Sequence, residues 1–147
     1  MALNVPLLRK SFDLVVERQP QITPRFYEIL FERYPAARPL FSRNAPERQQ
    51  QMLQEALVAV VENLENAPWL SQTLGAIGRK HLDYGVTDEM YDWVGDALLR
   101  TLGEIAGDAW TPELKAAWAE AYGALVTMAL AGANEARREA TTIPPGP

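Results

Sequence analysis

The sequence contains no cysteine and a single histidine in 147 residues. Without cysteine the chain forms no disulfide, holds no metal through thiolate sulfur and attaches no cofactor through a thioether bond. The absence of cysteine also fits a reducing compartment. A single imidazole by itself does not make a tetrahedral zinc site, which needs about four protein ligands, or three and a water.

Basic charge and long apolar runs are also scarce. Lysine and arginine total 14 against 19 aspartates and glutamates, so the net charge is −5. An acidic chain is poorly suited to bind nucleic acid, because that affinity depends on neutralising phosphates with a basic face. The longest stretch without charge, residues 121–134, is shorter than the ~20 apolar residues of a membrane span. Residues 1–10 lack the pattern of a signal peptide. We therefore expect a soluble, cytoplasmic protein that binds no nucleic acid and has no membrane span.

Every long segment of the chain has a helical period, and none has the two-residue alternation of a strand. Apolar residues recur every three or four positions in the segments 4–18, 24–34, 47–64, 69–82, 88–106 and 112–138. Thr23-Pro24 and Thr111-Pro112 each have the pattern of an N-cap followed by proline at the first helical position. Ser42–Pro46 is expected to be a loop. The length suits one domain.

The resulting prediction is an all-α chain with six or seven helices in one domain, residues 1–138. The remaining residues, 139–147, have no period and are predicted to be a disordered tail. Gly85 and Gly107 follow helical segments, and Gly85 resembles a left-handed C-cap.

The lone histidine, His81, lies near the end of the segment 69–82, four residues before Gly85. A single histidine on a helix is more often a structural or surface residue than a ligand. If His81 holds a metal through nitrogen, it does so without a second imidazole. One histidine is enough for haem, because the porphyrin supplies the other four nitrogens. Position alone leaves both interpretations open.

Several short groups of residues follow one another along the chain in an informative order and spacing. They are Phe26-Tyr27 with Leu30-Phe31, Pro35, Arg38–Phe41, Asn63–Asn66 with Pro68, Lys80-His81, Tyr91 with Val94-Gly95 and Leu98-Leu99, and Ala117-Trp118 with Ala121–Gly123. In this order and spacing, over about residues 5–133, the chain resembles the globin family. The resemblance is closest to bacterial single-domain globins and to the haem domain of flavohaemoglobins. It implies a globin fold around a haem pocket, which the unequal helix lengths favour over a four-helix bundle.

The resemblance also implies roles around a non-covalent haem b. On the distal side it assigns Tyr27 and Gln49 as donors to the bound gas, Leu53 as the apolar residue over the iron, and Phe41 as the ring against the haem face. On the proximal side it assigns His81 as the iron ligand, Val86, Tyr91 and Val94 as pocket residues, and Lys80 as a residue near the haem edge. Two alternatives stay open. Tyr27 could instead be a core aromatic residue, and a slip of one position within Gln49-Gln50-Gln51 would turn another glutamine into the pocket.

One position departs from the family pattern. Flavohaemoglobins place a glutamate of the last helix beside the proximal histidine, and that position is Ala133 in this chain. Glu135 lies two residues further on, about 200° around an ideal helix, and is a poor substitute. Because a carboxylate behind a ligand histidine makes it more basic, its loss weakens the case for oxygen-activating chemistry.

The resemblance implies a protein that binds oxygen and other diatomic gases, with oxygen held reversibly at pentacoordinate ferrous iron for storage or delivery. The alternative is a nitric oxide dioxygenase, which would oxidise nitric oxide to nitrate with electrons from a separate reductase. A gas sensor has less support, because no signalling domain is attached.

Overall fold

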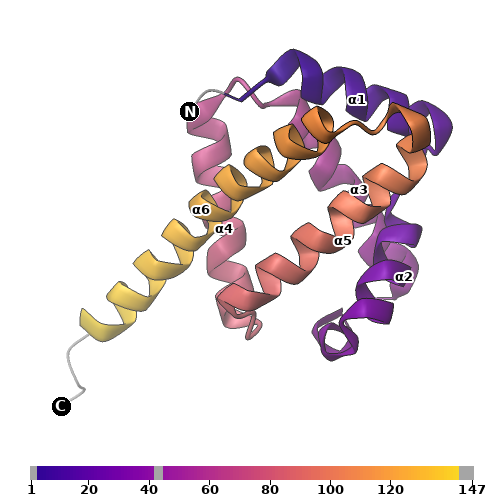
Figure 1. The fold of residues 1–147 in the computed structure, drawn as a ribbon. Helices are drawn as coiled ribbons and strands as arrows, with labels where there is room; N and C mark the ends of the chain where they lie inside the picture. The colour runs from indigo at the N-terminus through magenta and orange to yellow at the C-terminus, as the bar shows by residue number, and fades with distance from the viewer. Residues whose placement is uncertain (1–2, 42–44, 143–147) are drawn as a thin grey trace.

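The computed structural model describes residues 3–41 and 45–142, and within these ranges it contains helices and no strands (Figure 1). The elements in chain order are α1 (Val5–Arg18), α2 (Thr23–Arg33), the 3-10 helix η1 (Pro35–Phe41), α3 (Pro46–Glu62), α4 (Ala67–Asp83), α5 (Asp88–Ala106), the 3-10 helix η2 (Gly107–Ala109) and α6 (Pro112–Thr142). The prediction of an all-α chain with six or seven helices is confirmed. Of the loop predicted over Ser42–Pro46, residues 42–44 lie outside the described residues, and α3 already begins at Pro46.

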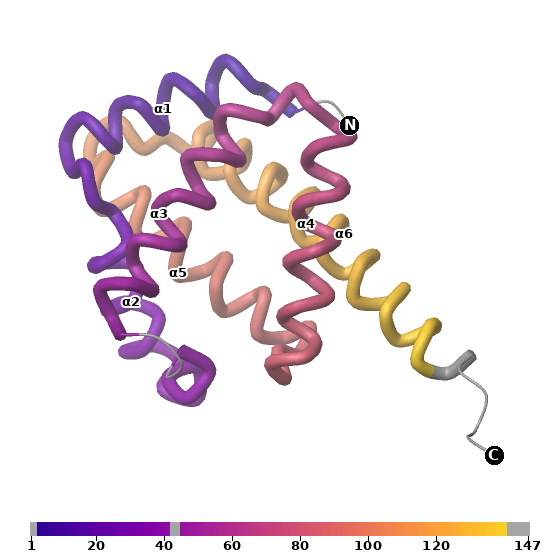
Figure 2. The backbone as a smooth tube through the Cα atoms, turned by 180° about the vertical axis from the view of Figure 1, so that it is seen from behind, coloured from indigo at the N-terminus to yellow at the C-terminus, as the bar shows by residue number. Residues whose placement is uncertain are grey.

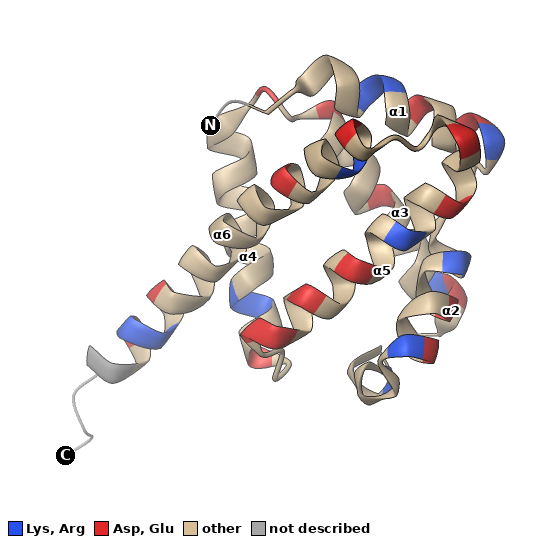
Figure 3. Cartoon of the chain, in the orientation of Figure 1, with Lys and Arg blue, Asp and Glu red and all other residues tan. Residues whose placement is uncertain are grey.

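The helices pack as a folded set rather than a parallel bundle. Figures 1 and 2 show α1 across one end of the molecule, with α3 and α4 leaving that end and diverging, and α4 running beside α6. The core lies between α1, α2, α5 and α6, where the largest fully buried side chains include Leu8, Phe26, Leu30 and Leu102. Figure 3 shows acidic residues along α5. Among the described residues, no helix is long and apolar enough to cross a membrane.

Helices α4 and α6 approach closely because glycines stand at their contact. A Cβ atom on Gly78 would lie 1.8 Å from the carbonyl oxygen of Ala129, and one on Gly132 would lie 2.1 Å from the carbonyl oxygen of Gly75. Real Cβ atoms never come so near to backbone, so a side chain at either position would force the helices apart. The close contact holds α4, the helix that carries His81, rigidly against α6.

The last turn of α4 ends in a Schellman motif that includes His81. The N–H of Val86 donates to the carbonyl oxygen of His81 at 2.9 Å, and the N–H of Gly85 donates to that of Leu82 at 3.0 Å. Gly85 has φ +86°, a left-handed conformation that costs glycine little. The predicted C-cap at Gly85 is confirmed, and it defines where the helix bearing His81 stops.

Helix α6 is longer than the sequence pattern indicated. The tail predicted to be disordered from residue 139 is helical as far as Thr142, so that prediction is wrong for residues 139–142. Arg79 of α4 explains the extension: its guanidinium contacts Glu139 at 2.9 Å and Glu135 at 3.3 Å. These ion pairs act across helices and leave no periodic apolar signal. Residues 143–147 lie outside the described residues.

Candidate functional site

Tyr27 and Gln49, the two predicted distal residues, are in contact. The side-chain nitrogen Nε2 of Gln49 donates a hydrogen bond of 3.2 Å to the hydroxyl oxygen of Tyr27. Tyr27 lies on α2 and is 6% exposed. Burial raises the pKa of the Tyr27 phenol above its ordinary value of 10.0, and the hydrogen bond from Gln49 offsets part of that rise. The phenol is therefore protonated at neutral pH and able to donate its own proton.

A contact between α2 and α3 decides which glutamine faces Tyr27. The hydroxyl of Thr23 donates to the backbone oxygen of Gln50 at 3.0 Å, which ties the start of α2 to the first turns of α3. In that register Gln49 reaches Tyr27, whereas the Gln51 side chain is exposed and donates to Glu55 at 3.2 Å. The predicted N-cap role of Thr23 is wrong, because its hydroxyl makes this interhelical bond instead. Thr111, by contrast, accepts from the N–H of Leu114 at 3.1 Å, as an N-cap does.

Aromatic rings surround Tyr27. The ring of Phe41 lies 5.2 Å from that of Tyr27 in an edge-to-face arrangement, and Phe31 lies 5.7 Å from both. Such pairs stabilise one another and fix ring orientation. Leu53, one turn beyond Gln49 on α3, is half-buried and packs against the core. The structure thus brings Tyr27, Phe41 and Gln49 together and places Leu53 on the helix that carries Gln49.

On α4, His81 is paired with Tyr91 of α5. The Nδ1 atom of His81 lies 3.3 Å from the hydroxyl oxygen of Tyr91, which is 9% exposed. Burial lowers the pKa of the His81 imidazole, so the ring is neutral at pH 7. The Nε2 atom has no hydrogen bond among the described residues. Every buried side-chain nitrogen and oxygen in that part of the chain has a partner, so Nε2 is in contact with open space.

Tyr91 is itself held by a residue to which the sequence analysis gave no role. The hydroxyl of Tyr122 on α6 donates to the backbone oxygen of Tyr91 at 2.6 Å. Gly95 makes this approach feasible, because a Cβ atom there would lie 2.6 Å from the Tyr122 ring. The pattern of a glycine one turn after Tyr91 was visible in the sequence, but the contact depends on how α5 and α6 cross.

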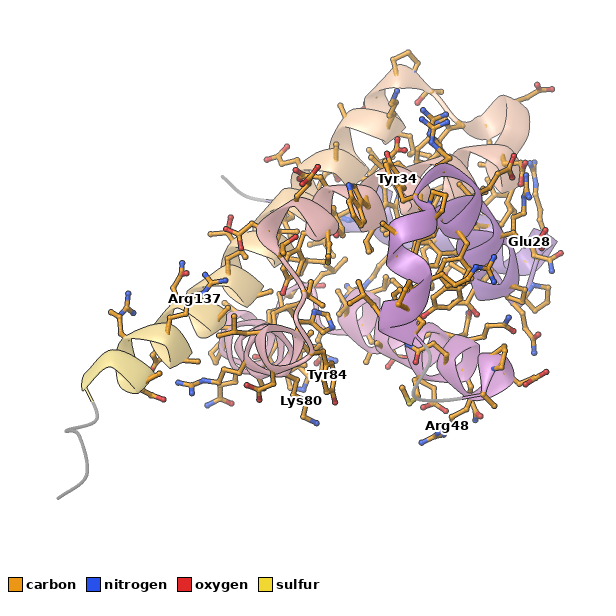
Figure 4. The ribbon with its side chains drawn as sticks, turned by 90° about the horizontal axis from the view of Figure 1, so that it is seen from below. Glu28, Tyr34, Arg48, Lys80, Tyr84 and Arg137 are labelled. Carbon is orange, nitrogen blue, oxygen red and sulfur yellow. The ribbon has the colours of Figure 1, made fainter. Side chains whose placement is uncertain are left out.

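The remaining predicted residues lie within five positions of His81 or Tyr91 in the chain. Val86 follows the end of α4, Val94 lies on α5, and both are half-buried. Lys80 is exposed. In Figure 4, Lys80 and Tyr84 project from the end of α4, and Arg48 projects from α3.

Among the described residues, no carboxylate makes a hydrogen bond to the His81 ring, although Asp88 lies near enough to Tyr91 to add to burial in raising the pKa of its phenol. Ala133 is buried, with 3% exposure, and Glu135 points to Arg79, 3.3 Å from its guanidinium. Among the described residues, the hydroxyl of Tyr91 is the polar group that contacts the His81 ring. This agrees with the expectation that Glu135 is a poor substitute.

A cavity of about 450 Å³ lies beside Tyr27 but does not suit a porphyrin. Its lining consists of Pro24, Tyr27, Glu28, Phe31, Glu32, Arg38, Pro46 and Gln50. Two carboxylates and a guanidinium in that lining are unfavourable against the apolar face of a large aromatic ligand. Tyr27 borders this cavity, but His81 and Leu53 are not in its described lining, so the cavity alone does not form the predicted cofactor site.

The chemistry of His81, Tyr27 and Gln49 fits an iron porphyrin. In the described part of the chain no three side chains of histidine, cysteine, aspartate or glutamate gather as a metal site. What is present is one neutral imidazole nitrogen that faces open space, a phenol and an amide that are hydrogen-bonded to each other, and half-buried apolar residues. A metal that brings four nitrogens of its own needs only such a set.

Comparison with known proteins gives consistent matches. A family model described as Globin matches residues 24–129. The chain is 38% identical over 135 residues to the flavohemoprotein of Rhizobium meliloti, covering 86% of this chain and 33% of that protein. It is 31% identical over 145 residues to the flavohemoprotein of Rhodopirellula baltica, covering 97% and 36%. The chain thus spans about a third of the length of the curated relatives it matches.

Solved structures agree with these matches. An engineered carbene transferase from Rhodothermus marinus, whose parent is named as a candidate nitric oxide dioxygenase, has a TM-score of 0.80 at 28% identity, covering 93% of this chain and 95% of that one. A flavohemoglobin from Malassezia yamatoensis with bound FAD and heme has a TM-score of 0.73 at 25% identity, covering 89% and 36%. The family model alone covers most of the sequence, and the fold agrees with it. This chain belongs to the globin family.

Proposed function

We propose that this globin binds haem b through His81 and takes up oxygen reversibly, for storage or delivery. The hydrogen bond between Gln49 and Tyr27 is the observation that carries the proposal, because it joins a phenol and an amide that are both able to donate to a bound gas. When bound, haem would supply the ferrous iron to which diatomic gases bind. Without cysteine the chain cannot attach haem through thioether bonds, which is consistent with non-covalent haem b.

The geometry of Tyr27 suits it to hold an oxygen ligand. Its hydroxyl oxygen accepts from Gln49, so its own proton points elsewhere, and the described residues offer it no acceptor. An oxygen ligand that carries partial negative charge would accept that proton in a hydrogen bond. A bond to a charged acceptor contributes about 1.5–3 kcal/mol, and about 1.4 kcal/mol changes an equilibrium constant tenfold. Tyr27 would therefore slow the loss of oxygen strongly.

The pairing of His81 with Tyr91 suits a neutral ligand. With Nε2 directed to the cofactor, Nδ1 carries the ring proton and donates it to the hydroxyl oxygen of Tyr91. Tyr122 and Gly95 hold Tyr91 in place from α6 and α5. A hydroxyl is a weaker acceptor than a carboxylate, so it draws less of the proton and leaves the imidazole less basic. This proximal side favours gas binding over oxygen activation.

A second candidate function is nitric oxide dioxygenation, with a separate reductase as the electron source. It is favoured by the similarity to flavohemoproteins and to the Rhodothermus marinus protein named for that activity. Tyr27 and Gln49 would hold the same oxygen ligand in either function. Ala133 counts against this candidate, because it stands at the position that resembles the glutamate site of flavohaemoglobins.

Two measurements test these functions. Absorption spectra of the purified protein, reduced and then exposed to oxygen, should show a stable oxygenated form that loses oxygen under vacuum. Immediate oxidation on contact with oxygen would rule out storage. Nitric oxide consumption should then be followed in the presence of a bacterial flavin reductase and NADH. Sustained turnover with nitrate formation would favour the dioxygenase, and a single turnover would favour the binding protein.

A further inference from the structure

Helices α5 and α6 leave a groove between them that is open to solvent. Its volume is about 310 Å³, and its apolar lining comes from Gly95 and Leu99 of α5 and from Tyr122, Gly123 and Val126 of α6. The Tyr122 ring packs against Gly95, where a Cβ atom would lie 2.6 Å from it, and so lies at the base of the groove. Leu99 and Val126 are only half-buried. An apolar hollow of this kind fits an apolar side chain from outside the molecule.

The shape of the groove fits a third helix. A Cβ atom on Gly123 would meet nothing within 4 Å, and Gly123 is exposed, as is Ala119 one turn earlier, which also lines the groove. The lining positions recur every three or four residues on both helices and extend over about two turns, or about 10 Å, of each. A helix packs along such a groove with its side chains between those of the two helices, and small residues let it approach closely.

The charge at one end of the groove is negative and unpaired. Asp92 lines the groove, is exposed, and takes part in none of the ion pairs of residues 3–41 and 45–142. Asp96, which also lines it, is already paired with Arg33 and Arg100, both at 3.0 Å. From residue 88 to residue 99, α5 has four acidic residues and no basic one, and Figure 3 shows this acidic row. A partner for the Asp92 end therefore needs a basic side chain.

The polar end of Tyr122 is used inside the protein. Burial raises the pKa of the Tyr122 phenol, and the negative charges of Tyr91 and Asp92 raise it further, so the hydroxyl keeps its proton. It donates that proton to the backbone oxygen of Tyr91 at 2.6 Å. The ring of Tyr122 therefore offers the groove only apolar surface. A partner seated there would touch a residue that holds Tyr91, the neighbour of His81.

We propose that this groove is a docking site for a helix of another protein, which inserts an apolar side chain beside Gly123 and pairs a lysine or arginine with Asp92. The partner helix has an apolar stripe bordered by basic residues. The acidic end of the groove disfavours a second copy of this chain, which is equally acidic there, and an anionic membrane surface. The inference goes beyond gas binding and is the same whether the globin stores oxygen or consumes nitric oxide.

Calorimetric titration with a synthetic helical peptide tests the docking site. The peptide has leucine at every third or fourth position and lysine on both sides of that stripe, and we expect it to bind the protein as purified. Gly123→Leu fills the groove, keeps every charge and should weaken binding about tenfold or more, because a leucine of the peptide loses its buried site. Ala116→Leu, which is exposed on the same helix and outside the groove lining, should bind as the wild type does.

An exchange of charges tests the pairing with Asp92. Asp92→Lys should weaken binding of the lysine peptide, and a peptide with glutamate in place of lysine should bind Asp92→Lys more tightly than it binds the wild type. Asp13→Lys makes the same change of net charge on α1 and should alter either affinity much less. Equal effects of the two lysine variants would show attraction by net charge only and would overturn the proposal. Absence of binding to the wild type, or undiminished binding to Gly123→Leu, would do the same.

Sedimentation velocity without peptide tests the second copy as the occupant. We expect the wild type and Gly123→Leu to sediment with the same mass. A wild-type dimer that Gly123→Leu dissociates would mean that a second copy of this chain fills the groove, which overturns the proposal. Circular dichroism checks that each variant is as helical as the wild type, and the absorption spectrum reports its haem content, so a failure of haem binding is recognised separately.

Discussion

Gln49 of α3 donates a hydrogen bond to Tyr27 of α2 across 3.2 Å, although 22 residues separate them in the chain. The contact couples the two residues proposed to hold a gas ligand, so changing either one should alter the other. Burial of Tyr27 keeps its phenol protonated, and Gln49 occupies its lone pair. Under the proposed function, the Tyr27 hydroxyl would donate its proton to the gas ligand rather than to Gln49.

Replacing Tyr27 with phenylalanine should speed oxygen dissociation by about ten- to a hundredfold, because a hydrogen bond of about 1.5–3 kcal/mol to a charged acceptor is lost. Stopped-flow displacement of oxygen by carbon monoxide gives this rate. Tyr84→Phe changes an exposed tyrosine and serves as control. An unchanged rate in Tyr27→Phe would remove Tyr27 from the proposed site.

The register of α3 predicts different effects for neighbouring glutamines. Gln49→Leu removes the donor to Tyr27 and should increase the oxygen dissociation rate, by less than Tyr27→Phe does because the phenol remains. Gln51→Leu removes an exposed contact to Glu55 and should leave the rate as in wild type. The same stopped-flow assay compares them. A larger effect of Gln51→Leu would mean that the register described here is wrong.

Changing His81 to alanine should abolish axial haem ligation, since the chain has no second histidine and no cysteine to replace it. The measurement is the Soret band of the purified protein together with haem content by extraction. Far-ultraviolet circular dichroism checks that the variant is still helical. A variant that keeps a normal ferrous deoxy spectrum would contradict the assignment of His81.

The oxygen dissociation rate should be independent of pH from 7 to about 10. Burial raises the pKa of Tyr27 above its ordinary value of 10.0, so its donor proton is retained throughout that range. Above the raised pKa the proton is lost and dissociation should accelerate. The Tyr27 phenol keeps its proton to a higher pH in the folded state than in the unfolded state. Tyr27 therefore lowers the free energy of unfolding as pH rises past 10. A rate that rises between pH 7 and 9 would be inconsistent with Tyr27 as donor.

Substitutions at two glycines, one inside the contact between α4 and α6 and one outside it, should change the free energy of unfolding in opposite directions. Gly78→Val should lower the free energy of unfolding by about 3 kcal/mol or more, because its Cβ meets the backbone of Ala129. Gly123→Ala, where a Cβ meets nothing within 4 Å in the interior of a helix, should raise it by about 0.5–1 kcal/mol. Urea denaturation followed by circular dichroism measures both. Equal stability of the two variants would refute the close contact.

Local patterns predicted much of the fold. Helical periods, Gly85 and Thr111-Pro112 depend on interactions within a few residues, and the structure confirms them. Predictions from local sequence patterns were wrong where a residue bonds to a distant helix. Thr23 bonds to Gln50 of another helix instead of capping its own. The end of α6 extends past residue 138 because Arg79 holds it through ion pairs.

The sequence by itself determined that the chain is all-helical and that a single histidine is available as a nitrogen ligand, because composition and short-range spacing carry that information. Only the tertiary structure decided that Gln49, rather than Gln50 or Gln51, meets Tyr27, and that Tyr91 and not Glu135 faces His81. Those pairings depend on how two helices are rotated against each other. A rotation of one residue, about 100° on a helix, changes the partner while leaving the periodic pattern of each helix the same.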